Sequence, residues 1–269
     1  MISLYILDFF TAILVIGAAA IATSSASNDH VYSFMEEWGS KGSADGEFVT
    51  PHTIAFDSFG NAYITDTDNQ RVQKFSSDGK FITKWGSKGS GDGEFSSHVH
   101  GIAIDSSDNV YVTDRFNHNI QKFSGEGKFI TKWGSKGSDN GQFNEPHSSA
   151  LDSSGNVYVS DTKNYRIQKF SPDGKFITKW GTKGSGDGQF ILPLGIDIGS
   201  SNRVYVIDQG KSSVELFTSN GIFVHPDLKP ATYGATNLSA LEDVELDQSD
   251  RIYITDRGEH NIKIYTNVK

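Results

Sequence analysis

The sequence repeats with a period near 47 residues, and this repeat constrains the fold more than any other feature. Trp-Gly pairs recur with spacings of 47, 48 and 47 residues, at Trp38, Trp85, Trp133 and Trp180. A strand-like run that ends in Asp recurs with spacings of 48, 47, 47 and 48 residues, at Asp66, Asp114, Asp161, Asp208 and Asp256. Five copies of about 49 residues fill residues 27–269, so no room is left for a second domain.

Each copy contains four short runs rich in β-branched and aromatic residues, separated by turn residues. In the second copy these runs are His100–Asp105, Asn109–Asp114, Asn119–Ser124 and Lys128–Gly134. Their apolar residues alternate with a period of 2, which indicates strands rather than helices. Four strands in a unit of this length are typical of a β-propeller blade, because stacked blades bury the faces that a lone sheet exposes. We therefore predict an all-β, five-bladed propeller with four antiparallel strands per blade.

The ends of the chain predict how the ring closes. The copies lie near residues 48–95, 96–143, 144–190, 191–238 and 239–269, and the last copy stops before its fourth strand. Val31–Gly39 aligns with the fourth strand of the other copies and has no first three strands before it. We predict that this segment pairs with the last blade, because closure removes two open sheet edges. The alternative is an open piece of a larger ring.

Residues 1–26 form a separate hydrophobic segment. Phe9–Ala22 is a run of 14 residues without a charge, which is the length of a signal-peptide core and short for a membrane span. Small residues that fit a cleavage site follow, although the first basic residue of the chain is Lys41. We expect a signal peptide and a secreted, extracytoplasmic protein, with membrane anchoring only if the segment is not cleaved.

Composition narrows the chemistry and the partners. The chain has no cysteine, which excludes disulfides, thiolate zinc sites and cysteine nucleophiles. Its net charge of −9 opposes binding to the phosphate backbone of nucleic acids. We expect a monomer that binds a protein or a small molecule and no nucleic acid.

The copies resemble NHL repeats. The matching strings are PHTIAFDSFGNAYITDTDNQRVQKFSSDG, from Pro51 to Gly79, and PHSSALDSSGNVYVSDTKNYRIQKFSPDG, from Pro146 to Gly174. The resemblance covers residues 31–269 and is weaker in copies four and five. It implies a propeller, although the family mostly has six blades rather than five. The family includes the peptidyl-hydroxyglycine amidating lyase, whose metal is held by histidines from several blades, and RNA-binding tripartite-motif proteins.

Histidine occupies one repeated position, five residues before the Asp that follows the first strand. The residues there are His52, His100 and His147, and copies four and five have Leu194 and Glu242 instead. This position opens the innermost strand, so we expect the side chains at the mouth of the central channel. Three imidazoles and a carboxylate are ligands of zinc, and the resemblance to the amidating lyase implies the same three-histidine arrangement. The alternative is that Pro-His is simply common to the repeated sequence, and that the imidazole rings hydrogen-bond to loops. No cofactor is expected unless this position holds a divalent metal such as zinc.

Two further repeated features are interpreted as architecture. The strand-end Asp residues can accept backbone N–H bonds or pair with Arg71 and Arg166. The Gly- and Asp-rich loops suggest calcium, but they lack both the EF-hand spacing and the nonapeptide pattern. We interpret them as connectors between blades: Gly42–Phe48, Gly89–Phe95, Gly137–Phe143 and Gly184–Phe190.

The turns between the second and third strands differ from copy to copy, whereas the turns at the opposite ends of the blades are nearly constant. The variable turns supply aromatic and arginine side chains of the kind that dominates binding hot spots: Arg115, Phe116, Tyr165, Arg166 and Arg257. The favoured interpretation is a non-catalytic binding or scaffolding propeller that recognises its ligand on this channel-mouth face. The alternative is a metal-dependent lyase or hydrolase with the histidine site at the central channel.

Overall fold

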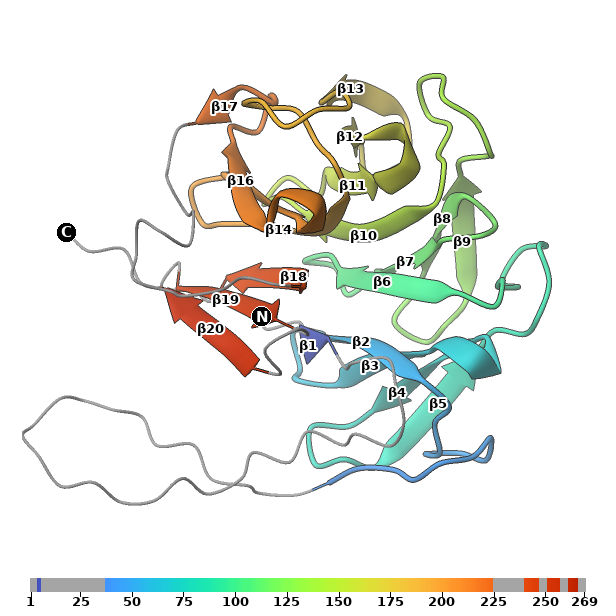
Figure 1. Cartoon of the computed structure of the whole chain (residues 1–269). Helices are drawn as coiled ribbons and strands as arrows, with labels where there is room; N and C mark the ends of the chain where they lie inside the picture. The colour runs from blue at the N-terminus through green and yellow to red at the C-terminus, as the bar shows by residue number, and fades with distance from the viewer. Residues whose placement is uncertain (1–3, 6–36, 225–239, 247–250, 257–260, 266–269) are drawn as a thin grey trace, which may run out of the picture.

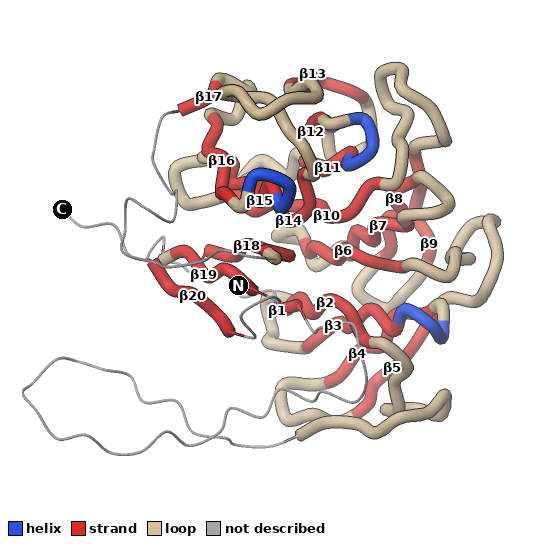
Figure 2. The backbone as a smooth tube through the Cα atoms, viewed as in Figure 1, coloured by secondary structure: helices blue, strands red, loops and turns tan. Residues whose placement is uncertain are grey.

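The computed structural model describes residues 4–5, 37–224, 240–246, 251–256 and 261–265. Five antiparallel sheets form a ring, with their first strands toward the middle (Figure 1). The helical turns of the described residues are short and follow second strands (Figure 2): η1 (Thr67–Asn69), η2 (Thr162–Asn164) and η3 (Gln209–Lys211). The prediction of an all-β, five-bladed propeller is confirmed.

Each blade runs in sequence order from an innermost to an outermost strand. Blade one contains β2 (Pro51–Phe56), β3 (Ala62–Asp66), β4 (Arg71–Phe75) and β5 (Phe81–Trp85). Blade two contains β6 (Val99–Ile104), β7 (Val110–Asp114), β8 (Asn119–Phe123) and β9 (Phe129–Trp133). Blade three contains β10 (Pro146–Leu151), β11 (Val157–Asp161), β12 (Arg166–Phe170) and β13 (Phe176–Trp180). Blade four contains β14 (Pro193–Ile198), β15 (Val204–Asp208), β16 (Ser213–Phe217) and β17 (Phe223–Val224), and blade five contains β18 (Leu241–Leu246), β19 (Ile252–Asp256) and β20 (Asn261–Tyr265).

Burial follows the position of a strand in its blade. Every residue of β3, β7 and β11 is buried, because neighbouring blades cover both faces of a second strand. The outermost strands β5 and β13 instead alternate between exposed and half-buried residues. The first strands of successive blades lie against each other, from β2 through β6, β10 and β14 to β18. The core therefore lies between the sheets, and the first strands line the centre.

The tryptophan that ends a fourth strand packs on the next blade. The ring centroids of Trp85 and Phe123 lie 5.7 Å apart, and those of Trp133 and Phe170 lie 5.9 Å apart. Trp85 also covers Gly127, which has a φ of +81° and whose added Cβ would lie 2.5 Å from Trp85 Cε3. Both the left-handed backbone and the covering ring therefore require glycine at this turn.

Trp38 packs on blade one in the same way. Its ring centroid lies 6.1 Å from that of Phe75, and it covers Gly79 as Trp85 covers Gly127. Trp38 thus occupies the place that the fourth-strand tryptophan of a preceding blade occupies elsewhere in the ring. The predicted pairing of Val31–Gly39 with the last blade lies outside the described residues, which resume at Glu37.

The N-terminal segment is described at one point. Leu4–Tyr5 forms β1, which pairs antiparallel with β2 and places Leu4 opposite Ile54. The rest of the predicted signal peptide lies outside the described residues. Within the described part of the chain, no helix combines the length and the apolar character needed to cross a membrane.

Replacing Gly127 with alanine should destabilise the propeller more than replacing Gly141 with alanine. Gly141 has a similar φ of +80° but nothing within 4 Å of an added Cβ, so its substitution costs only the backbone strain, about 1 to 2 kcal/mol. The methyl of Gly127→Ala must also displace Trp85, which adds roughly 2 kcal/mol. Urea unfolding of both variants measures the difference. Equal losses in the two variants would contradict the role of the tryptophan ring.

Candidate metal centre

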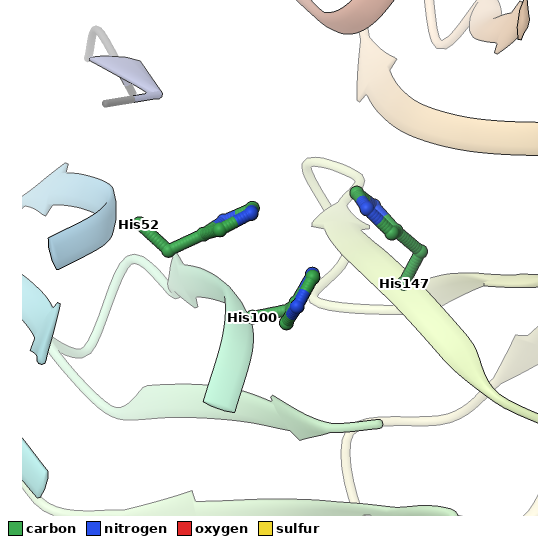
Figure 3. A group of neighbouring side chains, drawn as sticks. All are labelled: His52, His100 and His147. Carbon is green, nitrogen blue, oxygen red and sulfur yellow. The ribbon is translucent and has the colours of Figure 1, made fainter. Parts of the chain in front are cut away.

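Three histidines from three successive blades point toward one another (Figure 3). His52 lies in β2, His100 in β6 and His147 in β10. One ring nitrogen from each lies within 4.8 Å of the others. The ring centroids are 4.0 Å apart for His52 and His100 and 4.7 Å apart for His100 and His147. The repeated position of the sequence is therefore a compact cluster in space.

A β-bulge in each first strand holds these side chains. The register shifts between Pro51 and Ile54, between Val99 and Ile102, and between Pro146 and Ser149, so each histidine lies inside a bulge. Bulges turn a side chain out of the regular alternation of a strand. The local chain geometry of the repeat thus aims the same residue of each blade toward the same place.

Hydroxyl groups of the second strands fix the bulges. The N–H of Thr53 donates to Thr65 Oγ1 and the N–H of Ser148 donates to Ser160 Oγ, both at 2.9 Å. The Thr53 hydroxyl donates to the carbonyl of His100 at 2.7 Å and so links two blades. Sequence analysis missed Thr65 and Ser160. The available signal was a hydroxyl residue directly before the strand-end Asp, which copy four replaces by Ile207 together with the loss of its histidine.

The cluster is buried, and burial keeps two of its rings, His100 and His147, in the neutral form. Burial, followed by the neighbouring imidazoles, holds the pKa of His100 well below its usual range. Burial also holds the pKa of His147 well below its usual range, with His52 and Arg115 contributing. Both rings are therefore neutral near pH 7, which is the form that binds a metal.

Several ring nitrogens of the cluster have no hydrogen-bond partner in the described structure. Both nitrogens of His100 and Nδ1 of His147 are buried and unpartnered. A buried polar atom that lacks a partner costs about 1 to 3 kcal/mol. Nitrogens bound to one tetrahedral zinc ion at 2.0–2.1 Å stand about 3.4 Å apart, and one nitrogen from each of the three rings already lies within 4.8 Å of the other two. The residues present fit a transition metal that prefers imidazole, such as zinc.

The other two positions of the repeat do not join the cluster. Leu194 is buried among apolar side chains of blades four and five. Glu242 accepts a hydrogen bond from Gln209 Nε2 at 3.3 Å and does not belong to the metal-type group of the described residues. Three histidines, without the carboxylate of the fifth copy, therefore form the candidate centre.

Aromatic rings lead from the centre to the surface. His98 stacks on His100 with 5.6 Å between centroids, and it contacts Phe116 at 4.3 Å. Phe116 is 43% exposed. Arg115 lies beside it and pairs with Glu145 through Nη2 and Oε2 at 2.7 Å, and its hydrogen bond is the main cause that lowers the pKa of Glu145. Sequence analysis missed His98, whose signal was a second histidine two residues before His100.

The remaining candidates for the binding face have different surroundings. Tyr165 is half-buried against the core between blades three and four, with Lys183 Nζ 5.0 Å from its ring centroid. Arg166 is buried, and its guanidinium donates to Asp161 and to connector carbonyls. Arg257 lies outside the described residues. Of the five predicted residues, Arg115 and Phe116 are those that the structure places beside the histidines.

Comparison with known proteins agrees with this fold. A family described as a 6-bladed beta-propeller (DUF5128) matches residues 43–133, and the NHL repeat matches residues 143–170. None of the curated proteins matches the chain. The described blades number five, so the chain departs from the six of that family description.

Several solved structures are similar in fold. A streptogramin B lyase has a TM-score of 0.59 and 15% identity, over 80% of this chain and 68% of the lyase. Virginiamycin B lyase from Staphylococcus aureus has a TM-score of 0.58 and 14% identity, over 80% of this chain and 70% of the lyase. A protein of unknown function from Bacteroides caccae has a TM-score of 0.59 and 13% identity, over 77% of this chain and 70% of that protein. At these identities the likeness shows the fold alone. The chain therefore folds as a β-propeller of five described blades and carries an NHL repeat over residues 143–170, as its resemblance to the NHL-repeat propellers predicts.

Proposed function

We propose that the chain is a metal-dependent lyase or hydrolase whose metal is held by His52, His100 and His147. The observation that carries the proposal is the cluster of three buried imidazoles, in which both nitrogens of His100 and Nδ1 of His147 have no hydrogen-bond partner among the described residues. The three rings come from three separate blades, and the buried nitrogens of His100 and Nδ1 of His147 stay unpaired unless a ligand binds between the rings. Similar propellers that are lyases support an enzyme on this fold.

The chemistry of the donors supports zinc. When bound, a zinc ion with three nitrogen ligands supplies a fourth position, at which it polarises a carbonyl or acidifies a water molecule. The chain itself contributes the orientation of the ligands, because the bulges and the hydroxyl bonds fix the strands that carry them. His98 and Phe116 offer a row of rings on which an apolar or aromatic part of a substrate would rest.

Metal analysis of the purified protein tests the proposal. We expect close to one zinc ion per chain, lost with a chelator and regained on adding zinc. The variant with alanine at His52, His100 and His147 is the matched control and should contain none. A native protein that neither contains zinc nor takes it up would refute the metal centre.

A non-catalytic ligand-binding propeller is the second candidate. The exposed ring of Phe116, with Arg115 Cζ 5.4 Å from its centroid, favours this candidate because such side chains dominate binding hot spots. The ligand would be a protein or a small molecule on the channel-mouth face.

Phe116→Ala should weaken binding of a ligand captured on this face by more than tenfold, or about 1.4 kcal/mol. The change in the free energy of unfolding should stay within about 0.5 kcal/mol, because the side chain is exposed. Phe59→Ala is the control, since Phe59 is 77% exposed in a first-to-second-strand turn at the other end of the blade. Ligand affinity is measured for both variants. Unchanged affinity in Phe116→Ala would place the ligand elsewhere.

We also propose that residues 1–26 direct export and are removed. The uncharged run Phe9–Ala22 and the small residues after it support this proposal. Removal would also take away β1 and leave β2 as the inner edge of blade one. Mass spectrometry of the native protein should find an N-terminus near residue 27. An intact Met1 would contradict export with cleavage.

A further inference from the structure

In blades one and three, a buried arginine donates hydrogen bonds to the Gly- and Asp-rich connector that precedes the blade, Gly42–Phe48 in blade one and Gly137–Phe143 in blade three. Arg71 Nε donates to Asp66 Oδ2 at 2.7 Å, and its terminal nitrogens donate to the carbonyls of Ser43, Ala44 and Glu47 at 2.7–2.9 Å. Arg166 makes the same four bonds in blade three, to Asp161, Ser138, Asp139 and Gln142. One positive group therefore neutralises a buried carboxylate and satisfies three inward-facing carbonyls.

In blade four, a lysine instead of an arginine lies near the strand-end carboxylate and donates to the connector carbonyls. Lys211 Nζ donates to the carbonyls of Gln189 at 2.8 Å and Gly186 at 3.4 Å, and it lies 3.8 Å from Asp208 Oδ2. These carbonyls correspond to those of Glu47 and Ala44 in blade one. Three connectors thus contain a built-in cation of the chain.

Blade two has the same connector but a neutral side chain at this position. Asn119 stands opposite Asp114 in the register, as Arg71 stands opposite Asp66 and Arg166 opposite Asp161. The loop itself is unchanged. Gly89 N donates to Phe95 O at 2.9 Å and Phe95 N donates to Ser87 O at 2.8 Å, as the equivalent atoms of blade one do at 3.1 and 2.8 Å.

The oxygens that face arginine in the other blades are therefore present in blade two without it. They are the carboxylate of Asp114 and the carbonyls of Ser90, Gly91 and Glu94. The carbonyl of Glu94 keeps its bond from Gln121 Nε2, as the carbonyl of Glu47 keeps one from Gln73 beside its bond from Arg71. Within the described part of the chain, no basic side chain forms an ion pair with Asp114, whose carboxylate accepts hydrogen bonds from the N–H and the hydroxyl of Ser96.

Asn119 provides an independent observation that points to a ligand. The residue is 6% exposed, and its Oδ1 atom is buried and unpartnered among the described residues. A buried amide oxygen without a partner is costly, and Asn119 stands opposite the buried carboxylate of Asp114, so a cation bound between the two strands would satisfy it.

We propose that blade two binds a calcium ion at the place that Arg71 and Arg166 fill in blades one and three. The ligands are the Asp114 carboxylate, Asn119 Oδ1 and the carbonyls of Ser90, Gly91 and Glu94, with water completing the shell. All of these ligands are hard oxygen donors, which calcium prefers, whereas zinc prefers nitrogen and sulfur ligands. Lys132 Nζ approaches Ser90 O at 3.1 Å from the exposed side, and Asp92 neutralises it at 2.9 Å.

The ion would stabilise the turn that carries Arg115 and Phe116, next to the histidine centre. Asp114 also accepts a bond from the N–H of Asn117 at 3.1 Å, and Asn117 Nδ2 donates to both Asp114 and the carbonyl of Gly89. This turn carries Arg115 and Phe116. A cation on Asp114 therefore fixes the connector and the turn together. Because the site contains one carboxylate, the affinity should lie in the weak range of about 10⁻⁴–10⁻³ M.

Calorimetric titration of the whole purified protein with calcium tests the proposal. We expect one calcium ion per chain and, at 10 mM calcium, a rise in melting temperature of roughly 3–6 °C. Asn119→Arg copies blades one and three, so it should abolish the binding and raise the melting temperature of the calcium-free protein. Asn119→Ala keeps a small neutral side chain, and its calcium Kd should rise about tenfold because one ligand is lost.

Three results would overturn the site. They are a wild-type protein that binds no calcium at 10 mM, calcium binding that persists unchanged in Asn119→Arg, and saturation by potassium or magnesium in preference to calcium. The zinc content of each variant is measured in parallel. It should stay at the wild-type value, because the ligands of the two sites do not overlap, so the calcium site and the histidine centre stand or fail separately.

Discussion

Replacing His100 with alanine should lower the affinity of the chain for zinc by more than roughly 100-fold, since even residues behind metal ligands contribute 10- to 100-fold. His100 lies between the other two rings of the cluster, and both of its nitrogens are unpartnered. Its loss leaves two protein ligands, whereas catalytic zinc sites have three. Competition with a chromophoric chelator measures the change.

The same variant should behave differently with and without metal. In the metal-free protein, the substitution removes two unsatisfied nitrogens but opens a cavity, so the two effects on the free energy of unfolding oppose each other. In the presence of zinc, only the wild type should gain stability, because a ligand stabilises the state that binds it. His118→Ala is the control, since His118 Nδ1 accepts the N–H of Glu145 and lies outside the cluster. Wild-type zinc affinity in His100→Ala would rule out the centre.

Replacing Arg166 with alanine should lower the free energy of unfolding by about 3 to 5 kcal/mol. The change leaves the fully buried carboxylate of Asp161 without its cation and the carbonyl of Ser138 without its donor. The carbonyls of Asp139 and Gln142 each lose one of two hydrogen bonds, because the N–H of Gln142 and Gln168 Nε2 still donate to them. Breaking one partner out of a buried pair is costly because the other charge stays buried. Urea unfolding at constant pH measures the loss.

Arg115→Ala is the matched control for Arg166→Ala. Arg115 also forms an ion pair, with Glu145 at 2.7 Å, but the side chains of both residues are about a quarter exposed. Water screens such a pair, so its removal should cost less than about 1 kcal/mol. Comparable losses in the two variants would contradict the distinction between the buried connector arginine and the arginine at the rim.

The fold could be predicted because two periodicities agree along the chain. The alternation within each run indicates strands, and the spacing of Trp-Gly and of the strand-end Asp groups four strands into a unit. A repeated unit that buries its faces only against its neighbours has few other ways to fold. The predicted pairing of Val31–Gly39 with the last blade is an exception, because it would join residues far apart in sequence.

The sequence by itself determined the five blades and the alignment of His52, His100 and His147, since equivalent positions of a repeat occupy equivalent places in a ring. Only the tertiary structure decided which side chains meet. It brought one nitrogen of each of the three rings within 4.8 Å of the others, left Glu242 bonded to Gln209 and buried Arg166 under its connector. It also added His98 to the site and left Asn119, with an unpartnered amide oxygen, opposite Asp114 where blades one and three have arginine. The physical reason is that a repeat fixes the backbone position of a residue, whereas its contacts depend on bulges, on neighbouring blades and on single substitutions between copies.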